Sequence, residues 1–163
     1  MQAVVASDHA LTFAGRSFRA AVGRGGRRSD KREGDGATPL GPLALREVLY
    51  RPDRLAAPAA AAPVRALSPD DGWCDDPAHP DYNRMVRLPI AASHEALWRA
   101  DHVYDVIGVL GWNDAPIRPG LGSAIFLHVA RPDYAPTEGC VALSLADLLT
   151  ILAGGLTGIM VLG

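Results

Sequence analysis

The segment SAIFLHVARPDYAPTEGCVAL, residues 123–143, combines an apolar stretch, a histidine and a cysteine that follows a glycine. Residues 123–128 are apolar and partly β-branched, which predicts a buried strand with His128 near its end. Eleven residues separate His128 from Cys140, and Pro132 and Pro136 lie in that interval. We therefore expect a loop that leaves the sheet, turns at the prolines and returns Cys140 beside the strand.

The residue types in this segment are those of a nucleophile with its base. A cysteine attacks as the thiolate, and imidazole titrates near neutral pH, so His128 is the candidate base for Cys140. Gly139 permits a positive φ just before the cysteine, which could direct the Gly139 and Cys140 amides at a developing oxyanion. Thr137 could hydrogen-bond the turn or a substrate carbonyl. The alternative is that Cys140 is a small core residue and His128 a buried histidine with a satisfied ring.

The composition is typical of one compact domain. The chain has 163 residues, 48% of them hydrophobic, which predicts a single domain over residues 1–163. Sixteen Lys and Arg against eighteen Asp and Glu give a formal charge of −2, so we expect no nucleic-acid partner. The sequence lacks an apolar run of about 18 residues, so no membrane span is expected, and its N-terminus lacks the cationic start of a signal peptide.

The two cysteines, Cys74 and Cys140, are too few for a disulfide framework, although they could pair with each other. Cys74 precedes Asp75 and Asp76, whose charges would raise a thiol pKa. Cys140 is therefore the favoured nucleophile.

Acidic residues and histidines in the middle of the chain could be considered as metal ligands: Asp75, Asp76, His79, Asp101 and His102. Asp-rich loops more often cap turns, and no His-x-x-x-His spacing is present. We therefore expect no metal site and no cofactor.

Most of the remaining chain has the pattern of β-structure. We expect a hairpin from 11–13 and 17–22, a loop over 27–39, a strand over 43–50, an Ala/Pro-rich surface excursion over 55–63 and a long ordered loop over 68–89 that walls a site. A short helix over 93–100, a strand over 103–110, a helix over 144–152 opened by a Ser144-x-x-Asp147 capping box and a strand over 158–162 follow. The expected architecture is mainly β, a sandwich or partly open barrel with two short helices.

Several segments together carry a family resemblance. In addition to His128 and the Thr137-x-Gly139-Cys140 element, they are GG at 25–26, KREGDGATP at 31–39, DGWCDDP at 71–77, YNR at 82–84, LWRAD at 97–101 and GSAIFLH at 122–128. These segments cover nearly the whole chain, and they resemble the L,D-transpeptidase catalytic domain, often called the YkuD domain. The resemblance implies the same mainly β fold.

The resemblance also implies an activity on peptidoglycan stem peptides. Cys140 would attack the carbonyl between the L-centre of a diamino acid and a terminal D-alanine, with His128 as base, to form an acyl-thioester. An amine from a second stem would then form a cross-link, or water would trim the peptide. Tyr82, Arg84 and Asn113 are candidate substrate contacts, with packing or turn roles as the alternative. The substrate class implies a location in the periplasm or cell envelope.

Two positions depart from the family pattern. The best-known members carry His between Ser/Thr and Gly, and Arg two places after the cysteine, where this chain has Glu138 and Ala142. The roles of those two side chains therefore do not carry over. Three alternatives remain: an L,D-carboxypeptidase, another cysteine hydrolase of the cell wall, and a wall-binding module that keeps the fold without the chemistry. A papain-like peptidase is disfavoured, because in that class the cysteine usually precedes its histidine in the chain, whereas here His128 precedes Cys140.

Overall fold

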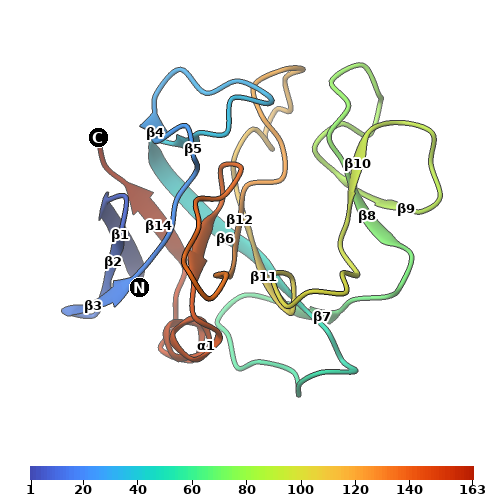
Figure 1. Ribbon diagram of the computed structural model, residues 1–163. Coiled ribbons are helices and arrows are strands. Elements are labelled where there is room, and N and C mark those ends of the chain that lie inside the picture. Colours follow the sequence, from blue (N-terminus) through green and yellow to red (C-terminus); the bar gives the residue numbers. More distant parts are fainter.

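A computed structural model describes residues 1–163, and it is built mainly of strands (Figure 1). The elements in chain order are β1 Gln2–Ser7, β2 Ala10–Phe13, β3 Arg16–Arg19, β4 Arg27–Arg28, β5 Thr38–Pro39, β6 Gly41–Tyr50, β7 Val64–Ala66, β8 Asp71–Cys74, β9 Met85–Arg87, β10 His94–Ala96, β11 Val106–Leu110, β12 Phe126–Val129, β13 Val141–Leu143, α1 Leu145–Ala153 and β14 Gly158–Val161.

The main sheet curls into a nearly closed barrel. Its strand order is β13-β12-β11-β6-β14-β1-β2-β3, and β7 pairs with β6 beside this path. Just beyond β3, Ala21 bridges to Ala142 on β13 through two backbone hydrogen bonds of 2.9 Å. This bridge joins the two ends of the sheet. The expectation of a mainly β, partly open barrel is confirmed.

The barrel interior holds the larger hydrophobic core, which α1 covers at one end (Figure 1). Apolar residues alternate along the strands, so each strand contributes one face to this core. Leu148, Ile151 and Leu152 of α1 are buried. Ser144 caps the helix by accepting a hydrogen bond from the Asp147 N–H, as predicted from the capping box.

A second, smaller sheet covers the outer face of β11 and β12. Its order is β10-β8-β9, and Figure 1 shows these strands beside the barrel. Trp73 of β8 packs edge-on against Phe126 of β12, with ring centroids 5.1 Å apart. Tyr104 contacts the other side of Phe126 at 5.8 Å. These aromatic contacts form the centre of a second apolar cluster, which also contains Cys140.

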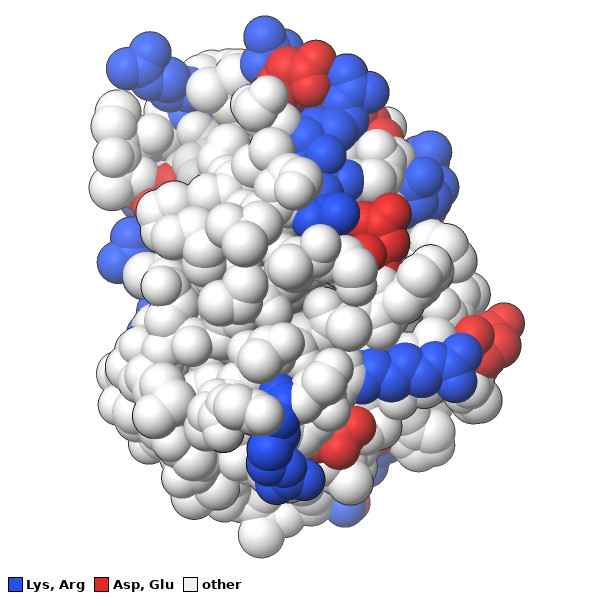
Figure 2. Space-filling model, turned by 90° about the vertical axis from the view of Figure 1, so that its left-hand side faces the viewer, with Lys and Arg blue, Asp and Glu red and all other residues white.

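The opposite face of the molecule, formed around β1–β3 and β14, is largely uncharged (Figure 2). Arg27 on this face pairs with Asp8 at 2.7 Å, whereas Arg16 and Arg19 of β3 lie over the rings of Phe18 and Tyr134. In the whole chain, no helix is long and apolar enough to cross a membrane.

Several predicted elements are confirmed: the hairpin, with a turn through Ala14 and Gly15 at positive φ, and the strands now seen as β6, β12 and β14. β11 starts at Val106, three residues later than the expected strand at 103. The helix predicted over 93–100 is wrong, because His94–Ala96 forms strand β10, paired antiparallel to β8. Residues 68–89 are likewise more than a loop, since they contain β8 and β9. Pairing with neighbouring strands, which local sequence does not encode, decides both cases.

Candidate active site

Alternation along β12 and β13 brings the histidine and the cysteine to one face. Leu127 and Val141 are aligned in the parallel pair β12–β13, and both belong to the barrel core. Successive side chains point to opposite faces, so Phe126, His128 and Cys140 all lie on the side covered by β8–β10. Cys140 is therefore beside Phe126 and diagonal to His128 on the same surface of the sheet.

Cys140 is held by two hydrogen bonds and is 6% exposed. Its Sγ accepts from the Phe126 N–H at 3.4 Å and donates to the Ala124 carbonyl at 3.3 Å. Burial raises the pKa of the thiol to about 12, and the negative charge of Glu95 adds to the shift. The thiol is therefore neutral in the resting protein.

His128 is a neutral base with a defined proton. Its Nδ1 lies 3.0 Å from the Val129 carbonyl oxygen, and because a carbonyl only accepts, Nδ1 carries the proton. The lone pair is therefore on Nε2. Burial lowers the pKa of the imidazole to about 4, and the Tyr104 ring packs edge-on against it at 5.5 Å.

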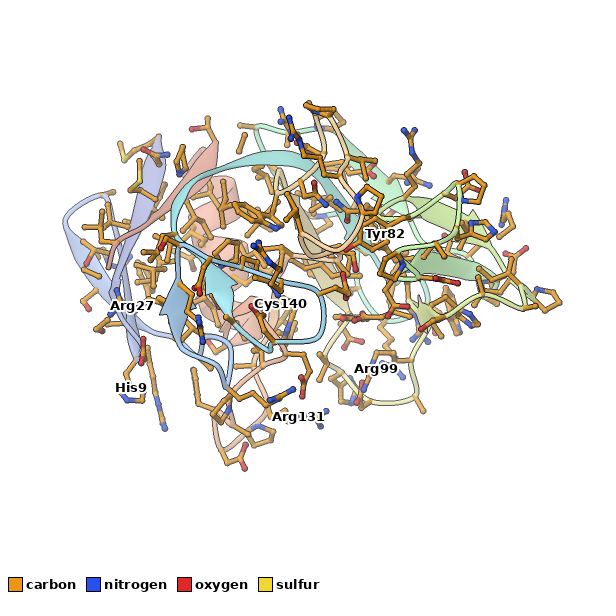
Figure 3. The ribbon with its side chains drawn as sticks, turned by 90° about the horizontal axis from the view of Figure 1, so that it is seen from above. His9, Arg27, Tyr82, Arg99, Arg131 and Cys140 are labelled. Carbon is orange, nitrogen blue, oxygen red and sulfur yellow. The ribbon has the colours of Figure 1, made fainter.

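Cys140 and His128 line one cavity of about 550 Å³, and no hydrogen bond joins them in this resting arrangement. The other lining residues are Lys31, Glu33, Gly34, Asp75, Glu95, Arg99, Val103, Tyr104, Ser123, Ala124, Arg131, Ala135, Pro136, Thr137, Glu138 and Ala142. Figure 3 shows Arg99 and Arg131 near Cys140, with Tyr82 on the other side of it. The cavity is polar and strongly charged.

The turn before the cysteine requires glycine and is fixed from outside by Thr38. Gly139 has a φ of +134°, and a Cβ there would lie 2.8 Å from the Ala37 carbonyl oxygen. The buried Thr38 hydroxyl donates to the Gly139 carbonyl at 2.8 Å and accepts from the Gly23 N–H at 2.9 Å. Residues more than 100 positions earlier in the chain therefore hold this turn.

Thr137 closes the same turn from inside. Its hydroxyl donates to the Cys140 carbonyl at 2.7 Å and accepts from the Gly139 N–H at 3.1 Å. The Gly139 amide is thus already engaged, which differs from the expectation that it faces an oxyanion. The Cys140 N–H makes no hydrogen bond within the protein, so it is the free donor next to the sulfur.

The other three candidate substrate contacts lie outside the cavity lining. Tyr82 is 2% exposed, and its hydroxyl donates to Glu33 and accepts from the Gly122 N–H at 3.0 Å. Asn113 has a positive φ and bonds to backbone groups of Arg118 and Gly122. The Arg84 side chain is exposed. Tyr82 therefore contacts the site through Glu33.

A neighbouring asparagine that the sequence reasoning missed organises this region. Asn83 is buried, and its Oδ1 accepts from the Trp73 indole and the Ala124 N–H at 3.0 and 3.1 Å. Its Nδ2 donates to the carbonyls of Trp112 and Asn113, both at 2.9 Å. Asn83 thereby connects the β8–β9 loop to the strand that carries the site. The signal available in the sequence was its place in the YNR segment at 82–84, since its positive φ is visible only in the structure.

Charged residues of the cavity wall were also missed: Lys31, Glu33, Glu95, Arg99 and Arg131. They come from four separate segments, and nothing in their local sequence marks them as neighbours. Lys31 is 4% exposed and binds Asp35 at 2.6 Å. The positive charge of Lys31 lowers the pKa of Cys140, but this effect is smaller than the increase caused by burial.

At the two positions that depart from the family pattern, the structure gives simple local roles. Glu138 forms an exposed ion pair with Arg24 at 2.8 Å. Ala142 is 1% exposed and supplies the backbone bridge that closes the barrel onto Ala21. Cys74 is buried on β8, and both cysteines are free, so they do not pair with each other.

Comparison with known proteins gives one result. Searches of curated proteins and of solved structures return no match. The sequence profile of the family described as "L,D-transpeptidase catalytic domain" (YkuD) matches residues 4–155, which include every element from β2 to α1 and the whole cavity wall. The chain therefore belongs to the YkuD family of L,D-transpeptidase catalytic domains, which acts on peptidoglycan.

Proposed function

We propose that this protein is a cysteine-dependent L,D-transpeptidase that cross-links peptidoglycan stem peptides through an acyl-thioester, with residues 1–163 as a single catalytic domain in the cell envelope. The observation that carries this proposal is the placement of Cys140 and the unprotonated Nε2 face of His128 on one cavity wall, beside the free Cys140 N–H.

In the acylation step, His128 Nε2 takes the thiol proton as Cys140 Sγ attacks the carbonyl before the terminal D-alanine. The two pKa shifts favour a neutral thiol and a neutral imidazole at rest, so proton transfer accompanies attack. The Phe126 N–H bond to Sγ and the free Cys140 N–H support the sulfur and the oxyanion respectively. The intermediate collapses, imidazolium gives its proton to the leaving nitrogen, and D-alanine departs.

In the second step, a primary amine of another stem attacks the thioester carbonyl. His128 Nε2 accepts the proton of that amine, the C–S bond breaks, and the thiolate is protonated by the imidazolium. The product is an amide cross-link, and both residues return to their starting state. Water in place of the amine gives the trimmed peptide.

Arg131 supports binding of the substrate carboxylate, the role for which Ala142 offers no side chain. Its guanidinium lines the cavity and makes no hydrogen bond within the protein; its nearest acidic partner, Asp101, is 3.9 Å away. By contrast, Arg99 is bound to the same Asp101 at 2.6 and 2.8 Å. A guanidinium with free donors is suited to a carboxylate.

The test is acylation by a carbapenem, followed by intact mass spectrometry and peptide mapping. We expect one covalent adduct on Cys140, its absence in Cys140→Ser and slower formation in His128→Ala. Cys74→Ala is the matched control, because Cys74 is the other free, buried cysteine, and it should still be acylated. No adduct on wild-type protein, or an adduct on Cys74, would refute the proposal.

Turnover of a tetrapeptide stem distinguishes linking from trimming. Release of D-alanine with formation of a dimeric peptide supports transpeptidation. Release of D-alanine with tripeptide as the only product would assign a carboxypeptidase instead.

A further inference from the structure

The charged groups of the cavity are unequally compensated. All three of its cations and one of its anions have partners of opposite charge within the protein: Lys31 with Asp35 at 2.6 Å, Arg99 with Asp101 at 2.6 Å, Arg131 with the same Asp101 at 3.9 Å and Glu138 with Arg24 at 2.8 Å. Three carboxylates, Glu33, Asp75 and Glu95, form no ion pair with any residue of the chain. One wall of the cavity therefore carries negative charge that the fold leaves unbalanced.

Two of these carboxylates are oriented by phenol groups. Glu33 accepts a hydrogen bond from the Tyr82 hydroxyl, and Glu95 accepts one from the Tyr104 hydroxyl. Each bond satisfies one oxygen and supplies no positive charge. Burial raises the pKa of Glu95, and the charges of Asp75 and Glu33 add to this shift, while the Tyr104 hydrogen bond and the charge of Arg99 oppose it.

Two unpartnered polar atoms belong to residues that line this cavity. Asp75 Oδ1 is buried and has no hydrogen-bond partner. Ser123 is 9% exposed, lines the cavity, and its Oγ also makes no hydrogen bond. Buried polar groups without partners are rare because each loses its hydrogen bonds to water on folding, so these two atoms point to a ligand with hydrogen-bond donors.

The chemistry of the wall selects the class of ligand. No three of its acidic groups approach closely enough to hold a metal ion. A primary ammonium group carries one positive charge and three hydrogen-bond donors, so it suits a cavity whose unpartnered groups are acceptors and whose unpaired charges are negative.

We propose that Glu33, Asp75, Glu95 and Ser123 form a subsite that binds a primary ammonium group of the peptide substrate beside Cys140. This inference rests on the proposed function, which it deepens. The ammonium belongs either to the side chain of the donor stem or to the incoming acceptor stem before it loses its proton. The site would thus select stems with a free amine over stems in which the amine is blocked.

The test measures binding rather than turnover. Calorimetry on Cys140→Ala protein compares a tetrapeptide stem that carries a free side-chain amine with the same peptide acetylated on that amine. We expect the free amine to bind about tenfold more tightly, since a charge-assisted hydrogen bond contributes about 1.5 kcal/mol or more. Adding Asp75→Asn should reduce this ratio to near one, and adding Ser123→Ala should reduce it less.

Asp76→Asn is the matched control. Asp76 is the adjacent carboxylate, lies outside the cavity lining and accepts a turn hydrogen bond from the Ala78 N–H that asparagine can also accept. A general structural defect lowers the affinity for both peptides and leaves their ratio intact, so the ratio reports the subsite. Equal affinities for the two peptides in the Cys140→Ala protein, or a ratio that Asp75→Asn leaves unchanged, would overturn the proposal.

The source of the ammonium is settled on wild-type enzyme whose Cys140 already carries a carbapenem. If selective binding of the free amine persists there, the subsite holds the acceptor; if selectivity is lost, it holds the donor. Failure of the proposed function is separate, because it appears as absence of the carbapenem adduct, whereas failure of the subsite appears in peptides binding to Cys140→Ala.

Discussion

The substitution Thr38→Val tests whether the turn before Cys140 depends on a hydroxyl from a distant segment. Thr38 is fully buried, and its Oγ1 joins the Gly23 N–H to the Gly139 carbonyl at 2.9 and 2.8 Å. Valine has nearly the same shape, so packing is preserved while both backbone groups lose their partner. Each unsatisfied buried group costs about 1–3 kcal/mol, which for the two groups predicts a loss of about 2–6 kcal/mol in the free energy of unfolding.

The measurement is urea unfolding followed by fluorescence, together with the melting temperature, which should fall by roughly 4–24 °C for a chain of this size. Thr150→Val is the matched control: its hydroxyl also donates to a backbone carbonyl, that of Ala146 at 2.8 Å, but it lies exposed on α1. The control should change stability by about 0.5 kcal/mol or less. Equal losses for the two variants would refute the view that Thr38 supports the turn.

The remaining predictions concern two groups that line the cavity, His128 and Arg131. His128 is neutral in the folded protein with a pKa near 4, against about 6.5 when unfolded, so the unfolded chain binds more protons between these values. The stability that this histidine contributes is complete above about pH 6.5 and falls by roughly 3 kcal/mol as the pH falls toward 4. In the His128→Gln variant, the free energy of unfolding should therefore depend less on pH in this window. Identical slopes for wild type and variant would contradict the assignment. Arg131→Ala should raise KM for the stem peptide about tenfold, because a charge-assisted hydrogen bond to the substrate is lost. Arg118 is an exposed arginine outside the cavity, so Arg118→Ala should leave KM unchanged. Equal KM values for the two variants would show that Arg131 does not bind substrate.

The placement of His128 and Cys140 in one cavity was predictable from the sequence because it depends on local rules. The apolar stretch before His128 indicates a strand, and a glycine before Cys140 indicates a turn with positive φ, which is what Gly139 adopts at +134°. The capping box at Ser144 likewise marked the start of α1. In each case the interacting groups are close in the chain, so residue type and spacing carry the information.

The wall opposite the pair was not predictable, because it is assembled from distant segments. Glu95 was placed in a helix, whereas pairing of β10 with β8 puts it in a strand and brings it to the Tyr104 hydroxyl. Glu33 depends on Tyr82, which lies 49 positions later. Neither contact has a local signature. Tyr82 was selected as a substrate contact because of its motif, and the structure places it behind Glu33 instead.

Closure of the barrel and the position of Cys140 depend on the same backbone contacts. In the segment that follows β3, Ala21 bridges to Ala142. The Val22 carbonyl accepts a hydrogen bond from the Thr137 N–H at 2.9 Å, and the Gly23 N–H donates one to the Thr38 hydroxyl. These contacts flank Cys140 on both sides, so β13 cannot shift without moving the sulfur. A free Cys140 N–H can persist here because the neighbouring amides are engaged and the backbone is held from outside the site. Ala142 takes part in this bridge through its backbone alone and offers no cation, and in the proposed mechanism Arg131, on the loop between β12 and β13, takes that role.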